Sequence, residues 1–422
     1  MLYSQKSIIE GSLSDQDLKE GLYEALSRIG PRRKVLAIPP DMSRFHSKAG
    51  LLTQYAWNYF GGALTDILPA IGTHAPMSSE EISRMYGDIP QSLFRIHNWR
   101  KDVVTLGIIP AEVINRLSEN KLSFDWPAQV NRLLLHGGFD LILSIGQVVP
   151  HEVIGMANYN KNIFIGTGGC DSINKSHYLG AVYGLERMMG RADTPVRELL
   201  NLAEERFAAD LPILYVHTVI GSSEKGEPLT KGLFIGDDTE CFYRAAELSQ
   251  NVNITFLDKA PSKIIAYLDP SEFKSTWIGN KAIYRSRMAI AEGGELVIIA
   301  PGVKEFGEDE GNDRLIRKYG YVGTDRVLEL VEKNEDLRQG LGTAAHLIHG
   351  SSEGKFTITY SPGHLSEEEI KAVNFRYAEP GKMLKLYDPE KLTPGYNTLS
   401  SGEEVYFIKN PGLGLWTTRE RF

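Results

Sequence analysis

Short apolar runs that alternate with helical patterns most constrain how this chain can fold. The runs are rich in Val, Ile and Leu, as buried parallel strands tend to be, and the segments between them have a helical spacing of apolar residues. This alternation predicts an α/β fold with mostly parallel sheets. In the first part of the chain we expect strands at Lys34–Ile38, Asp66–Ile71, Val103–Leu106, Leu141–Ile145, Asn162–Ile165 and Ile213–Val219, and helices at Asp15–Ser27, Leu51–Phe60 and Ser79–Met85.

The length of 422 residues predicts two domains, since a single core rarely grows so large. A second α/β pattern begins near residue 260. Its expected strands are Lys263–Leu268, Glu295–Ala300, Phe356–Tyr360, Leu384–Leu386 and Val405–Ile408, with a helix at Gly279–Ala291. We therefore expect an N-terminal α/β domain over residues 1–260 and a C-terminal α/β domain over residues 261–422. An active-site cleft is expected between them, the C-terminal domain closing over the substrate.

Composition excludes several classes of partner. The net charge is −8, and no basic run exceeds Arg32–Lys34, which argues against nucleic-acid binding. No stretch approaches the 18 or so uninterrupted apolar residues of a membrane span, and the N-terminus lacks the apolar core of a signal peptide. Two cysteines, Cys170 and Cys241, fit a reducing compartment rather than a disulfide framework. A cytoplasmic protein without nucleic-acid or membrane partners is expected.

Two histidines follow apolar, strand-like runs. His74 comes after Gly72-Thr73, and His151 comes after Pro150. Ligands of open α/β sheets usually bind at strand ends, and an imidazole there suits acid–base work near neutral pH. Either residue alone could equally be a capping or core histidine. Together they could face each other across a substrate and move protons on its two sides.

Lys161 and His177 extend this set. A lysine is usually a solvated surface charge, and it becomes a nucleophile or covalent anchor only in a desolvated cleft. His177 lies in the helical pattern Asp171–Gly190 and alone is more often structural than a metal ligand, because metal sites normally need several protein ligands. The glycine-rich segment Gly166–Gly169 is expected to join a strand to that helix, where backbone N–H groups can cradle a phosphate.

Three further charged residues are candidates for substrate binding. Asp41 and Arg44 follow the first expected strand, where an arginine can bind a carboxylate through two hydrogen bonds or form an ordinary ion pair. Lys281 lies in the first turn of an expected helix, against the helix dipole. The residues alone support an acid–base enzyme that acts on a small anion, and they leave the cofactor open.

The set resembles the nickel-pincer-nucleotide-dependent lactate racemase family, within the wider group of 2-hydroxyacid racemases and epimerases. The resemblance spans about residues 30–305. Pro-His, a Lys ten residues later and a His sixteen after that is similar to the family's signature, and His151, Lys161 and His177 reproduce it. Further matches are Asp41-x-Ser43-Arg44 to Asp-x-Thr-Arg, Gly72-Thr73-His74 to Gly-x-His, and Lys281, which stands twelve residues before Gly293-Gly294.

The resemblance implies a role for each residue. Lys161 would carry a pyridinium-3,5-bisthiocarboxylic acid mononucleotide through a thioamide link. His177 would be the one protein ligand to its nickel, since the cofactor supplies the other donors. His74 and His151 would be the two acid/bases. The implied reaction inverts C2 of a 2-hydroxyacid by hydride transfer to the cofactor, which carries the hard step. Among the substrate contacts that the resemblance implies, Arg44 and Lys281 would bind the carboxylate oxygens of the substrate. Asp41 would orient a catalytic group.

Departures from the family lie around the substrate and the cofactor. Ala157-Asn158-Tyr159-Asn160-Lys161 replaces Ser-Gly-Gly-x-Lys, so side chains stand where glycine lets the backbone approach the cofactor. Trp277, a candidate substrate contact, replaces a Tyr, and Ile278 replaces a Gln that touches lactate. The expected substrate is therefore a small 2-hydroxyacid other than lactate, and the family includes epimerases of sugar acids such as gluconate.

Two alternatives stay open. One is a metal-free isomerase in which His74 and His151 transfer protons directly. The other is a non-catalytic protein that binds a nucleotide or an anion. For the racemase reading, the implied partners are the substrate and the proteins that build the cofactor. The oligomeric state is left open by the sequence.

Overall fold

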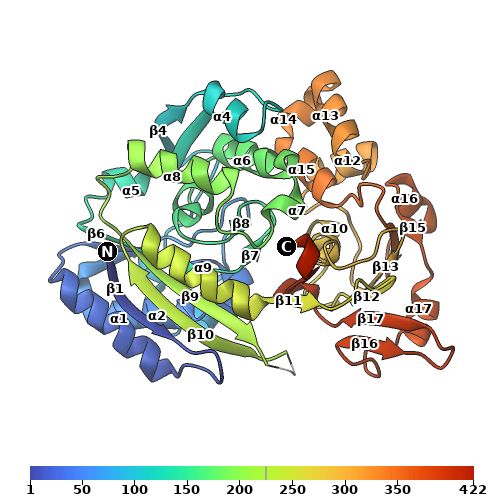
Figure 1. Cartoon of the computed structure of the whole chain (residues 1–422). Helices are drawn as coiled ribbons and strands as arrows, with labels where there is room; N and C mark the ends of the chain where they lie inside the picture. The colour runs from blue at the N-terminus through green and yellow to red at the C-terminus, as the bar shows by residue number, and fades with distance from the viewer. Residues whose placement is uncertain (224–225) are drawn as a thin grey trace. The chain divides into compact units, whose positions relative to one another are not determined.

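The computed structural model describes residues 1–223 and 226–422 and divides the chain into two compact units. The first unit comprises residues 1–179 and 190–253, and the second comprises residues 180–189 and 254–422. Each contains a six-stranded, mostly parallel sheet with helices packed on it (Figure 1). The predicted α/β fold class is confirmed.

The sheet of the first unit is parallel at its centre and antiparallel at one edge. The strands β9, β6, β2 and β3 run parallel, whereas β10 and β1 add an antiparallel edge. In spatial order they are β1 (Leu2–Ser7), β10 (Pro228–Gly236), β9 (Ile213–Ser222), β6 (Leu141–Gln147), β2 (Val35–Ile38) and β3 (Leu64–Ile67). The predicted strands at β2, β6 and β9 are confirmed, although β6 and β9 extend beyond their predicted ends, and β3 lies slightly earlier than predicted.

The two faces of this sheet bury different chemistry, because successive strand residues point to opposite sides. One face packs α1 (Asp15–Ile29) and α2 (Ala49–Phe60) against the strands, and Leu143, Leu214 and Val216 join their apolar core. The other face presents Tyr215 and His217 to α9 (Thr239–Asn253). The first face is an ordinary apolar core, whereas the second holds buried polar groups.

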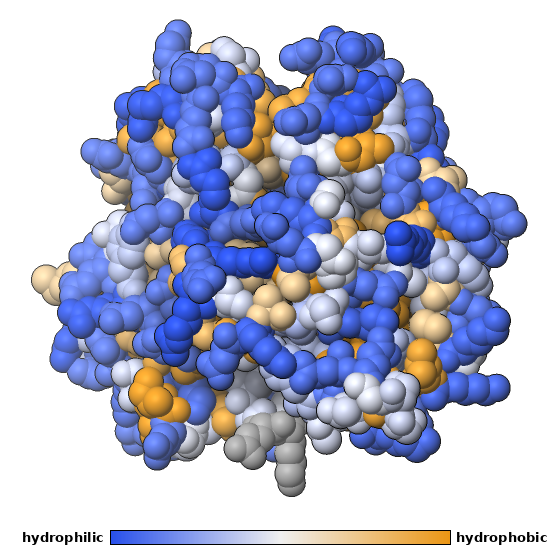
Figure 2. All heavy atoms as spheres, turned by 45° about the vertical axis from the view of Figure 1, so that its right-hand side comes forward, coloured by the Kyte–Doolittle hydropathy of each residue, from blue (hydrophilic) through white to orange (hydrophobic). Residues whose placement is uncertain are grey.

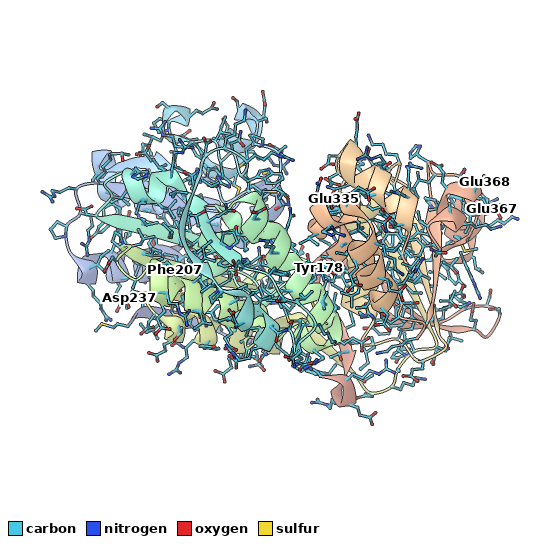
Figure 3. The ribbon with its side chains drawn as sticks, turned by 90° about the horizontal axis from the view of Figure 1, so that it is seen from above. Tyr178, Phe207, Asp237, Glu335, Glu367 and Glu368 are labelled. Carbon is cyan, nitrogen blue, oxygen red and sulfur yellow. The ribbon has the colours of Figure 1, made fainter. Side chains whose placement is uncertain are left out.

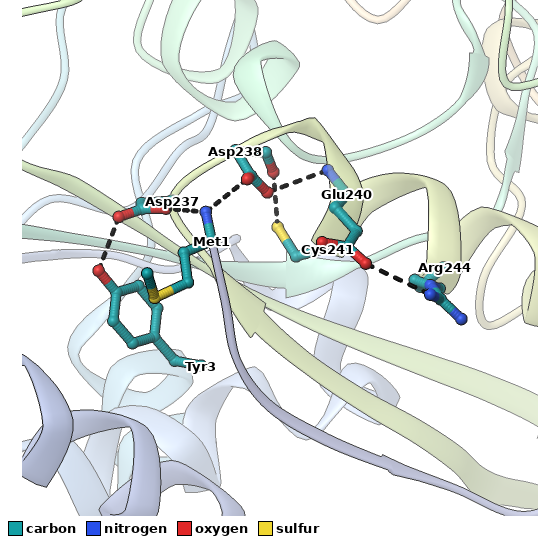
Figure 4. A network of polar contacts seen from close by, with 7 residues as sticks. All are labelled: Met1, Tyr3, Asp237, Asp238, Glu240, Cys241 and Arg244. Carbon is teal, nitrogen blue, oxygen red and sulfur yellow. Dashed lines mark hydrogen bonds and ion pairs between the residues drawn. The ribbon is translucent and has the colours of Figure 1, made fainter.

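The helix starts follow capping chemistry that can be read in the sequence. Ser14 caps α1 and Ser78 caps α3 (Ser79–Tyr86), each with a reciprocal bond to an acidic residue three positions later. The β1 edge strand is tied to the β10–α9 turn: the N-terminal ammonium bonds to Asp237 and Asp238, and the Tyr3 hydroxyl donates to Asp237 over 2.8 Å (Figure 4).

Two of the predicted strands are wrong. Asn162–Ile165 lies in a π-helical turn, Asn162–Gly166, in which the Thr167 N–H bonds to the carbonyl of Asn162 over 3.1 Å. Consequently Gly166–Gly169 joins this turn to α6 (Cys170–Tyr183), not a strand to a helix. Leu384–Leu386 ends helix α17 (Pro380–Leu386), which begins where Glu379 accepts two backbone N–H bonds.

A third predicted strand, Val103–Leu106, exists as β4 (Val103–Ile109) but lies outside the main sheet. It pairs antiparallel with β5 (Trp126–Asn131). Further along the chain, the short helix α7 (Leu185–Met188) follows α6. Helix α8 (Pro195–Phe207) comes next and leads into β9. The β4–β5 pair contacts α8, since the ring of Phe207 covers Gly107 of β4.

The sheet of the second unit is parallel except at one edge. Its spatial order is β15 (Arg376–Tyr377), β14 (Thr357–Pro362), β13 (Glu295–Ala300), β12 (Lys263–Tyr267), β17 (Glu404–Ile408) and β16 (Gly395–Thr398). Only β16 pairs antiparallel among these described strands. β11 (Ile254–Leu257) and β18 (Leu415–Thr418) form a separate parallel pair. The predicted strands at β12, β13, β14 and β17 are confirmed.

Helices of the second unit include two short ones, α10 (Thr276–Gly279) and α11 (Lys281–Ser286), in place of the single predicted helix Gly279–Ala291. Figure 3 marks Glu367 and Glu368 in the first turn of α16 (Glu367–Ala372), where acidic groups complement the helix dipole. On the face shown in Figure 2, hydrophilic residues predominate and hydrophobic ones form small groups. No described helix is long and apolar enough to cross a membrane.

Candidate active site

The carboxyl ends of three neighbouring strands place the first candidate residues. β6, β2 and β3 lie side by side and parallel, so the segments that follow them leave the same edge of the sheet. Asp41 follows β2, His74 follows β3, and His151 follows β6 in the short strand β7 (Pro150–His151). Residues far apart in the sequence therefore come to one edge of the first unit.

Asp41 and His74 form a hydrogen-bonded pair. The Nδ1 atom of His74 lies 2.6 Å from Oδ2 of Asp41, whose other oxygen accepts the backbone N–H and the hydroxyl of Ser43. Burial alone would raise the pKa of Asp41, but the hydrogen bond and charge of His74 outweigh it, so this pKa lies below its usual value. The carboxylate thus stays ionised and holds the imidazole.

This pairing fixes which nitrogen of His74 reacts. A carboxylate accepts only, so Nδ1 carries the proton and Nε2 carries the lone pair in the neutral ring. The His74 side chain remains about half exposed (56%), and Asp41 beneath it is nearly buried. His74 is therefore set up as a proton acceptor, as a histidine oriented by an aspartate is in other acid–base sites.

His151 has the opposite arrangement. Its Nδ1 accepts the backbone N–H of Val153 over 3.1 Å, so the neutral ring carries its proton on Nε2. Burial holds its pKa well below the ordinary value, and the charges of Lys161, Arg44 and His177 lower it further, against Glu152. His151 is thus neutral and presents an N–H donor, which suits it to hydrogen-bond a substrate oxygen.

Lys161 begins the turn that leads into the π-helix, and its surroundings weaken its charge. Burial comes first among the causes and the charge of Arg44 second, and together they lower the pKa of Lys161 to about 8, although Glu152 opposes them. An amine with this pKa is neutral in about a tenth of the molecules at about pH 7, far more than an ordinary lysine. It can therefore act as a nucleophile or an attachment point.

His177 lies in α6, the helix that carries Tyr178 in Figure 3. Its Nδ1 donates to the carbonyl of Ile173 over 2.7 Å, which leaves the lone pair on Nε2. Burial and then the charge of Lys161 lower the pKa of His177 to about 4, so the ring is neutral at physiological pH. A neutral imidazole whose other nitrogen is held by a carbonyl is the usual form of a metal-binding histidine.

The donor set decides which metal group this site could hold. Among the described residues, no three His, Cys, Asp or Glu side chains gather as a metal site. An aquated ion would find too few ligands here. A metal complex that brings its own donors, and that is anchored by an amine, needs only a neutral histidine and a partly deprotonated lysine. His177 and Lys161 fit such a group.

Not every candidate is brought into this set. Arg44 acts on both His151 and Lys161 through its charge. Trp277 and Lys281 belong to the second unit. There, the Trp277 ring stacks on His346 with centroids 4.4 Å apart, and Lys281 begins α11. Their contact with the substrate stays a prediction.

Sequence reasoning missed three groups near Lys161: Glu152, Asn160 and Arg197. Glu152 lies 3.7 Å from Nδ1 of His151. Asn160 is fully buried, and Arg197 is almost so. A polar residue next to Lys161 is a weak signal. The arginine stands 36 residues further on in α8, where its burial could not be anticipated.

Residues 4–188 match the lactate racemase N-terminal domain family. A protein from Thermotoga maritima of known crystal structure is similar over 98% of this chain and 100% of its own, with 25% identity and a TM-score of 0.81. The lactate racemase apoprotein of Thermoanaerobacterium thermosaccharolyticum is similar in fold over 96% of this chain and 89% of its own, with 16% identity and a TM-score of 0.67. No curated protein matches the chain.

Residues 4–188, somewhat less than half of the chain, thus match the lactate racemase N-terminal domain, and the chain is similar in fold to a lactate racemase apoprotein. The resemblance predicted from motif spacing is therefore confirmed. This kinship supports an activity of the racemase or epimerase type in general terms.

Proposed function

We propose that this protein inverts the C2 centre of a 2-hydroxyacid with a nickel-pincer nucleotide attached to Lys161. The observation that carries the proposal is the pairing of a lysine whose pKa is about 8 with a neutral, carbonyl-held histidine in one charge-coupled set. When bound, the cofactor would supply a hydride acceptor and the remaining metal ligands. Lys161 would hold it covalently, and His177 would ligate its nickel through Nε2.

The protein's own groups would handle the proton and the carboxylate. His74, held by Asp41, would take the hydroxyl proton of the substrate at Nε2. His151 would hydrogen-bond the substrate oxygen on the other side through its Nε2–H. For the reverse reaction His151 must accept a proton at Nε2. Its own proton must then lie on Nδ1, so the hydrogen bond that Nδ1 accepts from Val153 must break. Arg44 and Lys281 would bind the substrate carboxylate, each as a cation.

The substrate would be a 2-hydroxyacid larger than or different from lactate. Trp277 supports a substrate different from lactate, because its ring, which stacks on His346, stands in place of a tyrosine at a position predicted to contact the substrate. A sugar acid such as gluconate is the class to test first. A panel of enantiopure 2-hydroxyacids and epimeric sugar acids, followed by chiral chromatography, would identify it.

The deciding experiment measures intact mass and nickel content after co-expression with a pincer-nucleotide biosynthesis system. We expect a covalent adduct on Lys161, about one nickel per chain, and no adduct in Lys161→Ala. A lactate racemase expressed in the same system serves as the loading control. An unmodified, nickel-free chain beside a loaded control would refute the proposal.

The metal-free isomerase is the second candidate, because His74 presents a proton acceptor and His151 a hydrogen-bond donor without any cofactor. Turnover in deuterated water separates the two routes. Direct proton transfer would introduce solvent deuterium at C2, whereas hydride transfer would return the substrate's own hydrogen. A chain that binds nucleotide but isomerises no compound of the panel would instead be a binding protein.

A further inference from the structure

The turn before Lys161 has two consecutive residues in the left-handed region, which Asn adopts at times and Tyr rarely. Asn158 and Tyr159 have φ angles of 70° and 59°, in the left-handed region that favours glycine. They stand where the signature of the family has two glycines. Since neither is a glycine, the surrounding structure must hold this conformation.

Arg197 of α8 binds the turn through several hydrogen bonds. Its guanidinium donates to the carbonyl of Met156 over 2.9 Å, to the carbonyl of Asn158 over 3.1 Å, and to the side-chain oxygen of Asn160. The side chain is 1% exposed, and its charged group lies 4.2 Å from the ring centre of Phe242. The planar guanidinium of Arg197 therefore binds every second residue of the five that precede Lys161, namely Met156, Asn158 and Asn160.

The side chains of the turn are packed against the sheet and not left pointing at the attachment point. The Tyr159 ring contacts those of Tyr215 and Phe242, at centroid distances of 4.2 and 5.4 Å. The amide of Asn158 donates to His217 over 2.9 Å. The two residues that replace glycine are thus directed into the polar face of the sheet, beside α9.

Asn160 connects the same turn to α8. Its side-chain nitrogen donates to Asn201 over 2.7 Å and to Glu204 over 3.0 Å, and both acceptors lie on the helix that carries Arg197. Glu204 also accepts the hydroxyl of Tyr215. The backbone on the near side of Lys161 is therefore fixed to one helix through buried polar contacts, each costly to leave unmade.

We infer that Arg197 is a positioning residue, which fixes the left-handed turn at Asn158 and Tyr159 so that Lys161 is held ready for covalent attachment. The inference rests on the proposed function of Lys161. In this chain a buried arginine does what glycine does elsewhere: it makes the left-handed turn available. A lysine in its place would keep the charge but could not reach the same set of acceptors.

Three substitutions test the inference: Arg197→Met, Arg197→Lys and Arg287→Met. Arg287 is a matched control, because it is also buried and donates to a backbone carbonyl, that of Ser351, but lies in the other unit. Hydrogen exchange of residues 156–161 should speed up about tenfold or more in both Arg197 variants, since each loses hydrogen bonds from a charged donor. Exchange in β6 should stay unchanged, and Arg287→Met should leave residues 156–161 unaffected.

Covalent loading provides the second readout. After co-expression with the biosynthesis system, the fraction of folded chain with an adduct on Lys161 should fall at least about tenfold in Arg197→Met. Adding Asn158→Gly to that variant should restore much of the loading, because glycine adopts positive φ without the clamp. General destabilisation would lower loading in the Arg287→Met control as well and would not be rescued by the glycine.

The outcomes separate this inference from the proposed function. A loaded wild type together with an equally loaded Arg197→Met variant would overturn the inference alone, as would unchanged exchange at residues 156–161. A wild type without adduct beside a loaded control racemase would overturn the proposed function and the inference with it. Should Arg197→Met fail to fold, Arg197→Lys and Asn158→Gly in the wild-type background give the same comparison.

Discussion

Replacing Lys161 by methionine should stabilise the protein in the absence of cofactor. The lysine is held in surroundings that disfavour its charge, with burial as the largest cause, so its pKa falls from 10.5 to about 8. Below about pH 8 the folded chain carries the ammonium group in this unfavourable place. Methionine has a similar length, carries no charge and packs readily in irregular apolar space. The site therefore sacrifices stability to keep a reactive amine.

The size of the effect follows from the pKa. At about 1.36 kcal/mol for each tenfold change, the fall from 10.5 to about 8 corresponds to about 3.4 kcal/mol of unfolding free energy. The side chain is not wholly enclosed, so solvent relieves part of the cost and about 1–3 kcal/mol is expected. Between about pH 8 and about pH 10.5 the unfolded chain binds a proton that the folded chain does not. Wild-type stability therefore rises with pH across that window, and the advantage of methionine shrinks.

Urea unfolding of cofactor-free wild type and Lys161→Met measures this directly. At about pH 7 the variant should unfold at higher urea, and by about pH 9.5 more than half of the pH-dependent difference should be gone. Lys121→Met is the control, because Lys121 is exposed. A difference between wild type and Lys161→Met that is the same at both pH values would show that the amine is not held at a lowered pKa.

The other predictions concern the remaining site residues. His177→Ala should lose nickel and keep the adduct on Lys161, as measured by metal analysis and intact mass; retention of nickel would exclude His177 as its ligand. Asp41→Asn should lower turnover per loaded chain about tenfold, because His74 loses a hydrogen bond to a charged acceptor. The Asp41 pKa lies below its unfolded value of about 3.9, so its carboxylate stabilises the fold above that pH; the loss of stability in acid should be smaller in the variant. His151→Gln should stop isomerisation and leave loading intact, and turnover at the wild-type rate would remove it from the mechanism.

Much of the fold was predictable because the central strands of both sheets are short, apolar and mostly buried. β2, β6, β12 and β13 appear where their Val- and Ile-rich runs predict them. The run Ile163-Phe164-Ile165 has the same composition and yet forms a π-helical turn. Composition cannot separate these outcomes in so short a run. What decides is tertiary: the Asn162 side chain donates to the carbonyl of Ile38 and to Ser144, which fixes the turn against the sheet.

The sequence predicted those features of the candidate site that depend on the spacing of residues along the chain. It could not predict the features that depend on the direction of hydrogen bonds. The positions of Lys161 and His177 follow from motif spacing alone. Asp41 hydrogen-bonds His74, and its orienting role stays a prediction. The opposite proton positions on His74 and His151 could not be read from residue types. They depend on whether Nδ1 meets a carboxylate or a backbone N–H, which only the folded chain specifies.

The replacement of the glycines explains why spacing is the more dependable part of such a signature. Between Lys161 and His177 lie the π-helical turn, the Gly166–Gly169 segment and two turns of α6. One residue inserted in α6 before His177 would rotate its imidazole by about 100° around the helix axis and aim Nε2 elsewhere. No neighbouring side chain could correct that error. A residue change at Asn158 or Tyr159 can be corrected, because a new hydrogen-bond donor can hold the same backbone conformation. The number of residues between Lys161 and His177 therefore admits little variation. The two glycines of the signature can be replaced when a partner such as Arg197 holds the backbone of the turn.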